Sequence, residues 1–260
     1  MFYKPEKLPN LMVAPNGARP MKKDHSRVPV TIDEIVQTAK ACFDVGAGGI
    51  HFHLRDSNGR HILNSEMCLK ALEKLQANVP NMHLQITTEA VGRYSPEEMR
   101  KLAYEVIPPG LSIGIREMIP SRSPSEQDIK LYKSLTESGT KIQHICYEPE
   151  DIDLLSDLLN RSNITKDGTW CLFVIGHYSG KTSDPKKIPL FIEKLKLNNL
   201  NADWAVCAFG KEEFACLELS IKLGGKVRVG FENSMYLPNG DIAKDNETKV
   251  DVINRLLNLS

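Results

Sequence analysis

The chain has 260 residues, 41% of them hydrophobic and 25% charged, and 33 lysine and arginine residues balance 33 aspartate and glutamate residues. This is an ordinary globular composition, long enough for one large core or two small ones. The balanced charge gives no long-range field that would attract nucleic acid or an anionic membrane. No apolar run is long enough to cross a bilayer, and the first residues do not begin a signal peptide. We therefore expect neither nucleic acid nor membrane as a partner.

The six cysteines are scattered and form no Cys-x-x-Cys pair. Most lie among apolar residues, where cysteine behaves as a small core residue. This pattern indicates reduced thiols and a cytoplasmic protein.

Apolar periodicity and turn residues divide the chain into alternating short strands and helices. Strands are predicted at residues 11–14, 50–56, 84–88, 111–115, 141–147, 170–175, 204–208 and 226–230. One helix is capped by Thr31 and closed by Gly46, and another begins at the Ser95 capping box and ends before Pro108. The other helices are predicted at residues 66–76, 125–138, 151–159, 184–195, 211–223 and 246–257.

This alternation repeats about eight times without a linker. Strands separated by helices pair in parallel, and about eight such units are the size of a (β/α)8 TIM barrel, an α/β fold. We therefore expect residues 1–260 to form a single barrel domain with a C-terminal helix. A doubly wound open sheet is the alternative.

A His-x-His pattern in the second predicted strand indicates a metal site. Side chains alternate between the faces of a strand, so His51 and His53 point the same way. Two imidazoles on one face bind a divalent metal when a third ligand arrives from elsewhere. Glu232 lies just past the eighth predicted strand, which neighbours the first strand in a closed barrel.

Two interpretations of Glu232 remain open at this point. Arg228, Gly230 and Glu232 share strand parity, so one face carries a cation, a gap and a carboxylate. If Glu232 reaches both imidazoles, the result is a His2Glu set with open positions, typical of catalytic zinc. If Glu232 instead forms an ion pair with Arg228 at the barrel rim, the histidines are simply accommodated.

Other polar residues follow the remaining strands toward the same mouth, because the active site of a (β/α)8 barrel lies at the C-terminal ends of its strands. Each could instead satisfy a strand end, pack, or form a solvated pair. These residues are Asn16, Arg19, Thr87, Thr88, Glu89, Ser112, Arg116, His177 and Tyr178.

Three segments in this order resemble the β-keto acid cleavage enzyme family over residues 11–257. They are His-Phe-His-Leu-Arg-Asp with a later Gly-Arg, Leu-Phe-Val-Ile-Gly, and Val-Arg-Val-Gly-Phe-Glu-Asn-Ser-Met-Tyr-Leu. The resemblance implies a (β/α)8 barrel with catalytic Zn2+. It also implies a reaction in which a β-keto acid and acetyl-CoA, a co-substrate, become acetoacetate and a new acyl-CoA.

Carried over residue by residue, the resemblance implies zinc on His51, His53 and Glu232. The metal would chelate keto and carboxylate oxygens and stabilise the negative charge that develops. Thr87 and Ser112 match substrate-contacting positions of the family, and Arg228 matches its catalytic arginine. Together with the residues that follow the strands, this predicts catalytic residues at Arg228, Asn233 and Glu89, and substrate-binding residues at Asn16, Arg19, Thr87, Thr88, Ser112 and His177.

Three positions depart from the family pattern. Asn233 replaces an aspartate that handles protons, and an amide is no base at neutral pH. Ile145 replaces a carboxylate in the fifth strand, so Glu89 or a zinc-bound hydroxide could be the base. Arg19 replaces the acidic residue that recognises the amino group of 3-keto-5-aminohexanoate, which favours an anionic substrate.

Two other functions remain open: a metal-dependent C–C hydrolase or aldolase that does not use CoA, and a barrel that binds a metabolite without catalysis. The chain stops at Ser260, whereas related chains usually continue into tails that help to build oligomer contacts. A homo-oligomer, by resemblance a tetramer, is expected.

Overall fold

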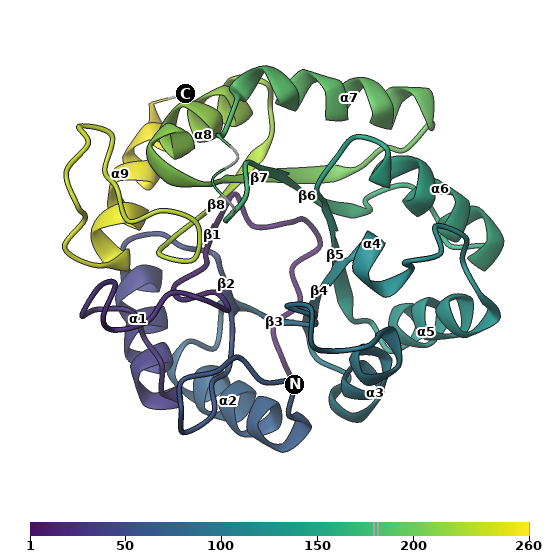
Figure 1. Cartoon of the computed structure of the whole chain (residues 1–260), viewed down its shortest axis with the longest axis horizontal. Helices are drawn as coiled ribbons and strands as arrows, with labels where there is room; N and C mark the ends of the chain where they lie inside the picture. Colours follow the sequence, from purple (N-terminus) through teal and green to yellow (C-terminus); the bar gives the residue numbers. More distant parts are fainter. Residues whose placement is uncertain (179, 181, 260) are drawn as a thin grey trace.

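Eight short apolar segments pair side by side in sequence order and close on themselves. The computed structural model describes residues 1–178, 180 and 182–259. All eight strand pairs are parallel, and the last strand pairs with the first, which closes the barrel seen end-on in Figure 1. The strands are β1 (Leu11–Val13), β2 (Gly49–Phe52), β3 (His83–Thr87), β4 (Gly110–Gly114), β5 (Lys141–Cys146), β6 (Trp170–Ile175), β7 (Asp203–Ala208) and β8 (Lys226–Val229). The predicted (β/α)8 barrel is confirmed, and the open sheet is excluded.

The helices lie around the outside of the strands (Figure 1). They are α1 (Ile32–Asp44), α2 (Ser65–Asn78), α3 (Pro96–Val106), α4 (Ile115–Met118), α5 (Glu126–Glu137), α6 (Asp151–Ser162), α7 (Ile188–Leu197), α8 (Glu213–Lys222) and α9 (Asn246–Asn258), with 3-10 turns η1 (Pro185–Lys187) and η2 (Gly210–Glu212). Thr31 and Ser95 cap α1 and α3 through reciprocal capping boxes, as predicted.

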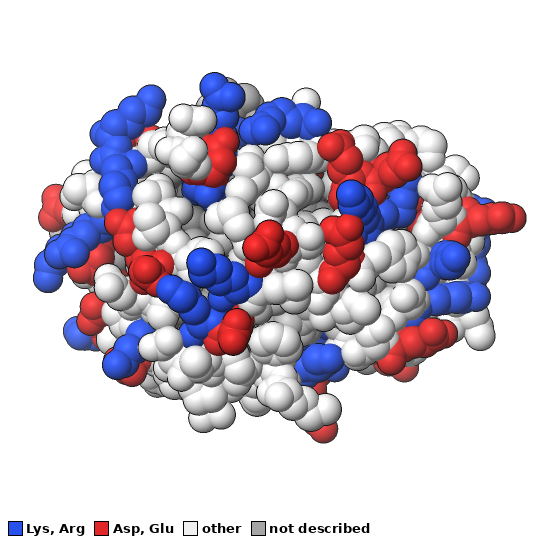
Figure 2. All heavy atoms as spheres, turned by 90° about the horizontal axis from the view of Figure 1, so that it is seen from below, with Lys and Arg blue, Asp and Glu red and all other residues white. Residues whose placement is uncertain are grey.

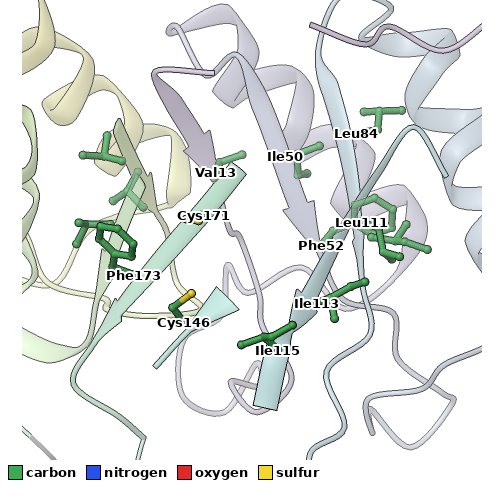
Figure 3. Packing of buried hydrophobic residues seen from close by; sticks show 14 of the residues in the cluster. Val13, Ile50, Phe52, Leu84, Leu111, Ile113, Ile115, Cys146, Cys171 and Phe173 are labelled. Carbon is green, nitrogen blue, oxygen red and sulfur yellow. The ribbon is translucent and has the colours of Figure 1, made fainter. Parts of the chain in front are cut away.

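Strand alternation separates two apolar layers. Ile50, Leu84, Leu111 and Phe173 belong to the larger layer, between strands and helices, part of which is shown in Figure 3. A smaller layer fills the barrel interior with Met12, Ile145, Leu172 and Val174. The interior is therefore packed, as in other barrels of this class, and a site must lie above it at the strand ends.

Several predicted boundaries differ from the observed ones, and two strand ends differ for a clear physical reason. The second strand ends at Phe52 instead of continuing to residue 56, because Arg55 forms an antiparallel bridge with His61 and the chain turns back. Ile115 begins α4 instead of ending a strand. A four-residue helix is too short to show a helical period, so this turn left no signal in the sequence.

The molecular surface reflects the balanced charge of the chain. Figure 2 shows lysine and arginine interspersed with aspartate and glutamate on the face in view. Within the described residues, no helix has the length and apolar character needed to span a membrane.

Candidate active site

His51, His53 and Glu232 meet at the C-terminal end of the barrel. The two histidine Nε2 atoms are 3.0 Å apart. Glu232 Oε2 lies 3.5 Å from His51 Nε2 and 3.6 Å from His53 Nε2. All three side chains are buried. The histidines come from the end of β2 and Glu232 from the segment after β8, so the cluster joins the two strands that flank β1.

Glu232 also forms an ion pair with Arg228, whose Nη2 lies 3.0 Å from Oε1. One carboxylate oxygen thus faces the guanidinium and the other faces the imidazoles. Glu232 therefore makes both of the contacts that the sequence offered as alternatives, one with the imidazoles and one with Arg228.

A turn, not strand alternation, carries Glu232 into the site. Strand β8 ends at Val229, and Ser234 N–H donates to the Gly230 carbonyl at 3.2 Å. Gly230 has φ +148°, and a Cβ there would lie 2.2 Å from the Ala14 carbonyl oxygen. A residue without a side chain is therefore required where this turn crosses the end of β1.

Burial sets the protonation of the cluster. It lowers the pKa of His51 far below the usual value, with Arg228 adding to the effect, and likewise lowers the pKa of His53, with His61 adding. Both imidazoles are therefore neutral and have a lone pair available. Burial also raises the pKa of Glu232 to about 7, although Arg228 opposes this shift.

This donor set fits a divalent metal ion. His51 Nδ1 lies 2.9 Å from the amide oxygen of Gln85, which can only accept, so the lone pair is on Nε2. Glu232 Oε2 is buried and has no hydrogen-bond partner among the described residues. Ligand atoms about 2.0–2.1 Å from a tetrahedral zinc are about 3.3 Å apart. The separations of 3.0, 3.5 and 3.6 Å are close to that value.

The cluster opens on an inner cavity of about 30 Å³. Two residues that line it carry buried polar atoms without partners among the described residues: Nε and Nη1 of Arg228, and both amide atoms of Asn233. Unpaired buried polar groups are costly, so these atoms indicate that a polar ligand completes the site. Ile145 lines the same cavity with an apolar side chain.

Glu89 and Arg19 lie at the entrance. Arg19 Nη1 is 3.0 Å from Glu89 Oε1, and the other Glu89 oxygen is 3.6 Å from His53 Nδ1. The guanidinium of Arg19 also lies over the ring of Tyr178, 4.2 Å from its centroid. Burial raises the pKa of Glu89, against the opposing effect of Arg19. Glu89 therefore retains a proton more readily than an exposed glutamate.

Two larger cavities adjoin the inner one and share Arg19, Tyr178 and Phe209 with each other. The first outer cavity, of about 310 Å³, is also lined by Arg116 and His177. The second outer cavity, of about 570 Å³, extends over residues 231–236. The inner cavity therefore borders two outer cavities, which also adjoin each other.

Among the residues predicted to bind substrate, Thr87 lines the inner cavity. Its neighbour on β4, Ser112, is buried, and its hydroxyl has no partner among the described residues. Asn16 and Thr88 line none of the three cavities. Asn16 bonds to both backbone groups of His53, and Thr88 donates to the Ser112 carbonyl at 3.0 Å. The hydrogen bonds of these two side chains lie within the wall of the site.

Several buried polar residues of this region were not predicted from the sequence to belong to the site. Gln85 and Gln143 are fully buried inside the barrel beneath His51, and Arg55 is buried under the loop after β1. A glutamine in the middle of an apolar strand is a signal that could have revealed the first two. Arg55 gave no such signal, because its partners are backbone carbonyls.

Known proteins resemble this chain over most of its length. The 3-keto-5-aminohexanoate cleavage enzyme of Acetoanaerobium sticklandii is 26% identical over 244 residues, 92% of this chain and 88% of the relative. The 3-oxoadipate:acetyl-CoA acetyltransferase of Cupriavidus necator is 23% identical over 249 residues, 94% of this chain and 86% of the relative.

Among solved structures, the binary complex of ObcA with oxaloacetate superimposes with a TM-score of 0.71 at 12% identity. The match covers 88% of this chain and 63% of ObcA, so the chain spans less than two thirds of that protein and shares its fold. The family model described as beta-keto acid cleavage enzyme matches residues 10–259. The chain belongs to the β-keto acid cleavage enzyme family.

Proposed function

We propose that this protein is a zinc-dependent enzyme that cleaves an anionic β-keto acid with acetyl-CoA as co-substrate, releasing acetoacetate and a new acyl-CoA. The observation that carries the proposal is the buried His51, His53 and Glu232 cluster, which shares its cavity with atoms of Arg228 and Asn233 that have no partner among the described residues. Family membership and a relative named as an acetyl-CoA acetyltransferase support the use of a CoA thioester.

Zinc held by His51, His53 and Glu232 would polarise the keto and carboxylate oxygens of the substrate. Arg228 Nε and Nη1, which have no partner in the described part of the chain, can donate to oxygen atoms on which negative charge develops. Glu89, with its raised pKa, is our candidate for the group that takes and returns a proton. Asn233 orients a ligand through its amide but cannot act as a base. Tyr147, Val174 and Phe209 provide apolar contact around the inner cavity.

Arg19 supports an anionic substrate. It stands at the point shared by both outer cavities, and its side chain is 46% exposed, so it is accessible to an arriving ligand. Arg116 and Lys187 also line the first outer cavity, but Glu117 and Glu148 lie in the same wall, so Arg19 carries this argument. The relative from Cupriavidus necator is named for 3-oxoadipate, a β-keto acid with a second carboxylate. We propose a substrate of this chemical class.

The metal content of purified wild type, His53→Ala and Glu232→Ala tests the site. We expect about one zinc per chain in the wild type, as a four-coordinate site predicts, and its loss from both variants. His25→Ala, outside the cluster, is the matched control and should retain the metal. Zinc lost from His53→Ala alone would remove Glu232 from the ligand set. No metal after reconstitution would contradict the proposal.

Incubation of the zinc-loaded wild type with 3-oxoadipate tests the reaction. We expect acetyl-CoA to be consumed and acetoacetate to form. Cleavage without CoA would instead identify a hydrolase or aldolase, and ligand binding without turnover would identify a metabolite-binding barrel. We also propose a homotetramer on the basis of the family resemblance; light scattering that shows a monomer would contradict this.

A further inference from the structure

A line of three polar side chains crosses the barrel interior beneath the site. His51 Nδ1 lies 2.9 Å from Gln85 Oε1, and Gln85 Nε2 donates to Gln143 Oε1 at 3.1 Å. Both glutamines are fully buried. A buried amide lowers the stability of the fold unless it is hydrogen-bonded. Gln143 Nε2 has no partner among the described residues. Packing alone does not account for these two buried amides.

The strand register makes this contact possible. His51 on β2 is directly opposite Gln85 on β3. Gln143 lies on β5, two strands from Gln85, and β4 runs between them. On β4, Gly110 is opposite Gln85 and Ser112 is opposite Gln143. These small residues leave the path open, so the two amides meet across β4.

The direction of the Gln85 amide decides which His51 nitrogen carries the proton. While the Gln85 NH2 group donates to Gln143, its oxygen faces His51 Nδ1, and an oxygen can only accept. The proton then lies on Nδ1 and the lone pair on Nε2, toward Glu232. The reversed amide would donate to Nδ1 and force the proton onto Nε2, which would block the ligand atom.

We propose that Gln85, oriented by Gln143, is a positioning residue that holds His51 in the tautomer that binds metal. The proposal rests on the proposed function, since that function makes His51 a ligand. His53 differs, because its Nδ1 has no hydrogen-bond partner among the described residues and lies 3.6 Å from Glu89 Oε2. Gln85 in the barrel interior therefore orients His51, whereas His53 faces Glu89 in the loop after β3.

Four variants test the proposal together with the wild type. Gln85→Met removes the acceptor at nearly constant volume. Gln143→Met removes the group that orients Gln85, whereas Gln143→Glu keeps a carbonyl oxygen that can accept from the Gln85 NH2 group. Gln76→Met makes the same chemical change on α2, outside the barrel interior, and is the matched control. Circular dichroism and thermal unfolding establish that each variant is folded.

Two readouts are independent of catalysis. Long-range 1H–15N correlation spectra of 15N-histidine protein, assigned with His51→Gln, report the His51 tautomer without zinc. Competition with a chelator gives the zinc affinity. We expect Nδ1-protonated His51 in the wild type, and zinc affinity about 10–100-fold weaker in Gln85→Met. Gln143→Met should give a smaller loss and a mixture of tautomers. Gln143→Glu and Gln76→Met should bind zinc like the wild type.

A zinc-free wild type with His51 protonated on Nε2 would overturn the proposal. So would a folded Gln85→Met that binds zinc as tightly as the wild type, or a Gln143→Glu variant that behaves like Gln143→Met. A wild type that binds no zinc but shows Nδ1-protonated His51 would instead contradict the proposed function and leave the orienting contact confirmed. The two failures are therefore distinguishable.

Discussion

At the scale of single residues, the site combines a preserved ligand set with an altered set of ionisable groups. The inner cavity presents Ile145 and Asn233 where the family resemblance implies carboxylates. The carboxylate of Glu89 lies beside the outer nitrogen of His53, with Oε2 3.6 Å from His53 Nδ1. Its other oxygen is bound to Arg19, so the charge of the entrance arginine and the protonation of Glu89 are coupled.

Arg19→Glu should reverse the preference between substrates. A charge-assisted hydrogen bond contributes about 1.5–3 kcal/mol, so kcat/KM for a dicarboxylic keto acid should fall by about 10–150-fold. Activity on an amino-bearing keto acid should rise, and the zinc content should stay unchanged. Arg19→Gln, which removes the charge without reversing it, is the control. If Arg19→Glu keeps full activity on the dicarboxylic acid, Arg19 does not select the substrate.

At the scale of elements, the loop after β1 is held by one buried arginine. Arg55 Nη1 donates to the Ala18 carbonyl at 2.8 Å and to the Gly59 carbonyl at 3.1 Å. Its Nη2 donates to the Pro20 carbonyl at 3.0 Å and also to the Gly17 carbonyl. The guanidinium thus ties the loop after β2 to the loop that carries the entrance arginine.

Replacing this residue should loosen the mouth of the barrel. Arg55→Met leaves at least three buried carbonyls without donors, and each such group costs about 1–3 kcal/mol. We expect the free energy of unfolding to fall by about 3 kcal/mol or more. Amide exchange across residues 16–20 should also become faster. Chemical denaturation and hydrogen–deuterium exchange measure the two effects. Arg60→Met, at an exposed position, is the control; equal stability of both variants would contradict the assignment.

At the scale of the whole molecule, buried neutral histidines make the fold sensitive to acid. Burial lowers the pKa of His51, His53, His61, His83 and His144. As the pH falls, these histidines lower the free energy of unfolding, whereas carboxylates with a raised pKa, such as Glu232, raise it. His83 isolates the histidine effect, because it lies at the start of β3, away from the metal cluster, with both ring nitrogens unpartnered among the described residues.

His83 should make the protein less stable as the pH falls. Burial lowers its folded-state pKa from 6.5 to about 3, so below pH 6.5 the unfolded chain binds a proton that the folded chain does not. The contribution is complete above pH 6.5 and is lost toward pH 3, by up to about 1.4 kcal/mol per pH unit. Denaturant unfolding of zinc-free wild type and His83→Leu at pH 7.5, 6 and 5 measures this. The difference between them should change by about 2 kcal/mol between pH 7.5 and 5; parallel curves would contradict it.

Local patterns in the chain were enough for the barrel and for the candidate metal ligands. The alternation of strand and helix periods, the Ser95 capping box and the glycines that end helices are all local, so the order of the elements could be read directly. His51 and His53 are two residues apart, and Glu232 follows a recognisable strand. Their meeting also required the eighth strand to lie beside the first, which closure of the barrel guarantees, and the turn at Gly230 that carries Glu232 into the site.

The surroundings of these ligands depended on the tertiary structure. The contact between Gln85 and Gln143 joins residues 58 positions apart in the chain, across a strand that carries only small side chains there. The carbonyls around Arg55 come from two separate loops. Sequence periodicity shows which face a side chain occupies, but it does not show which partner is opposite. Strand register and barrel closure decide that, because they set the distances between groups far apart along the chain.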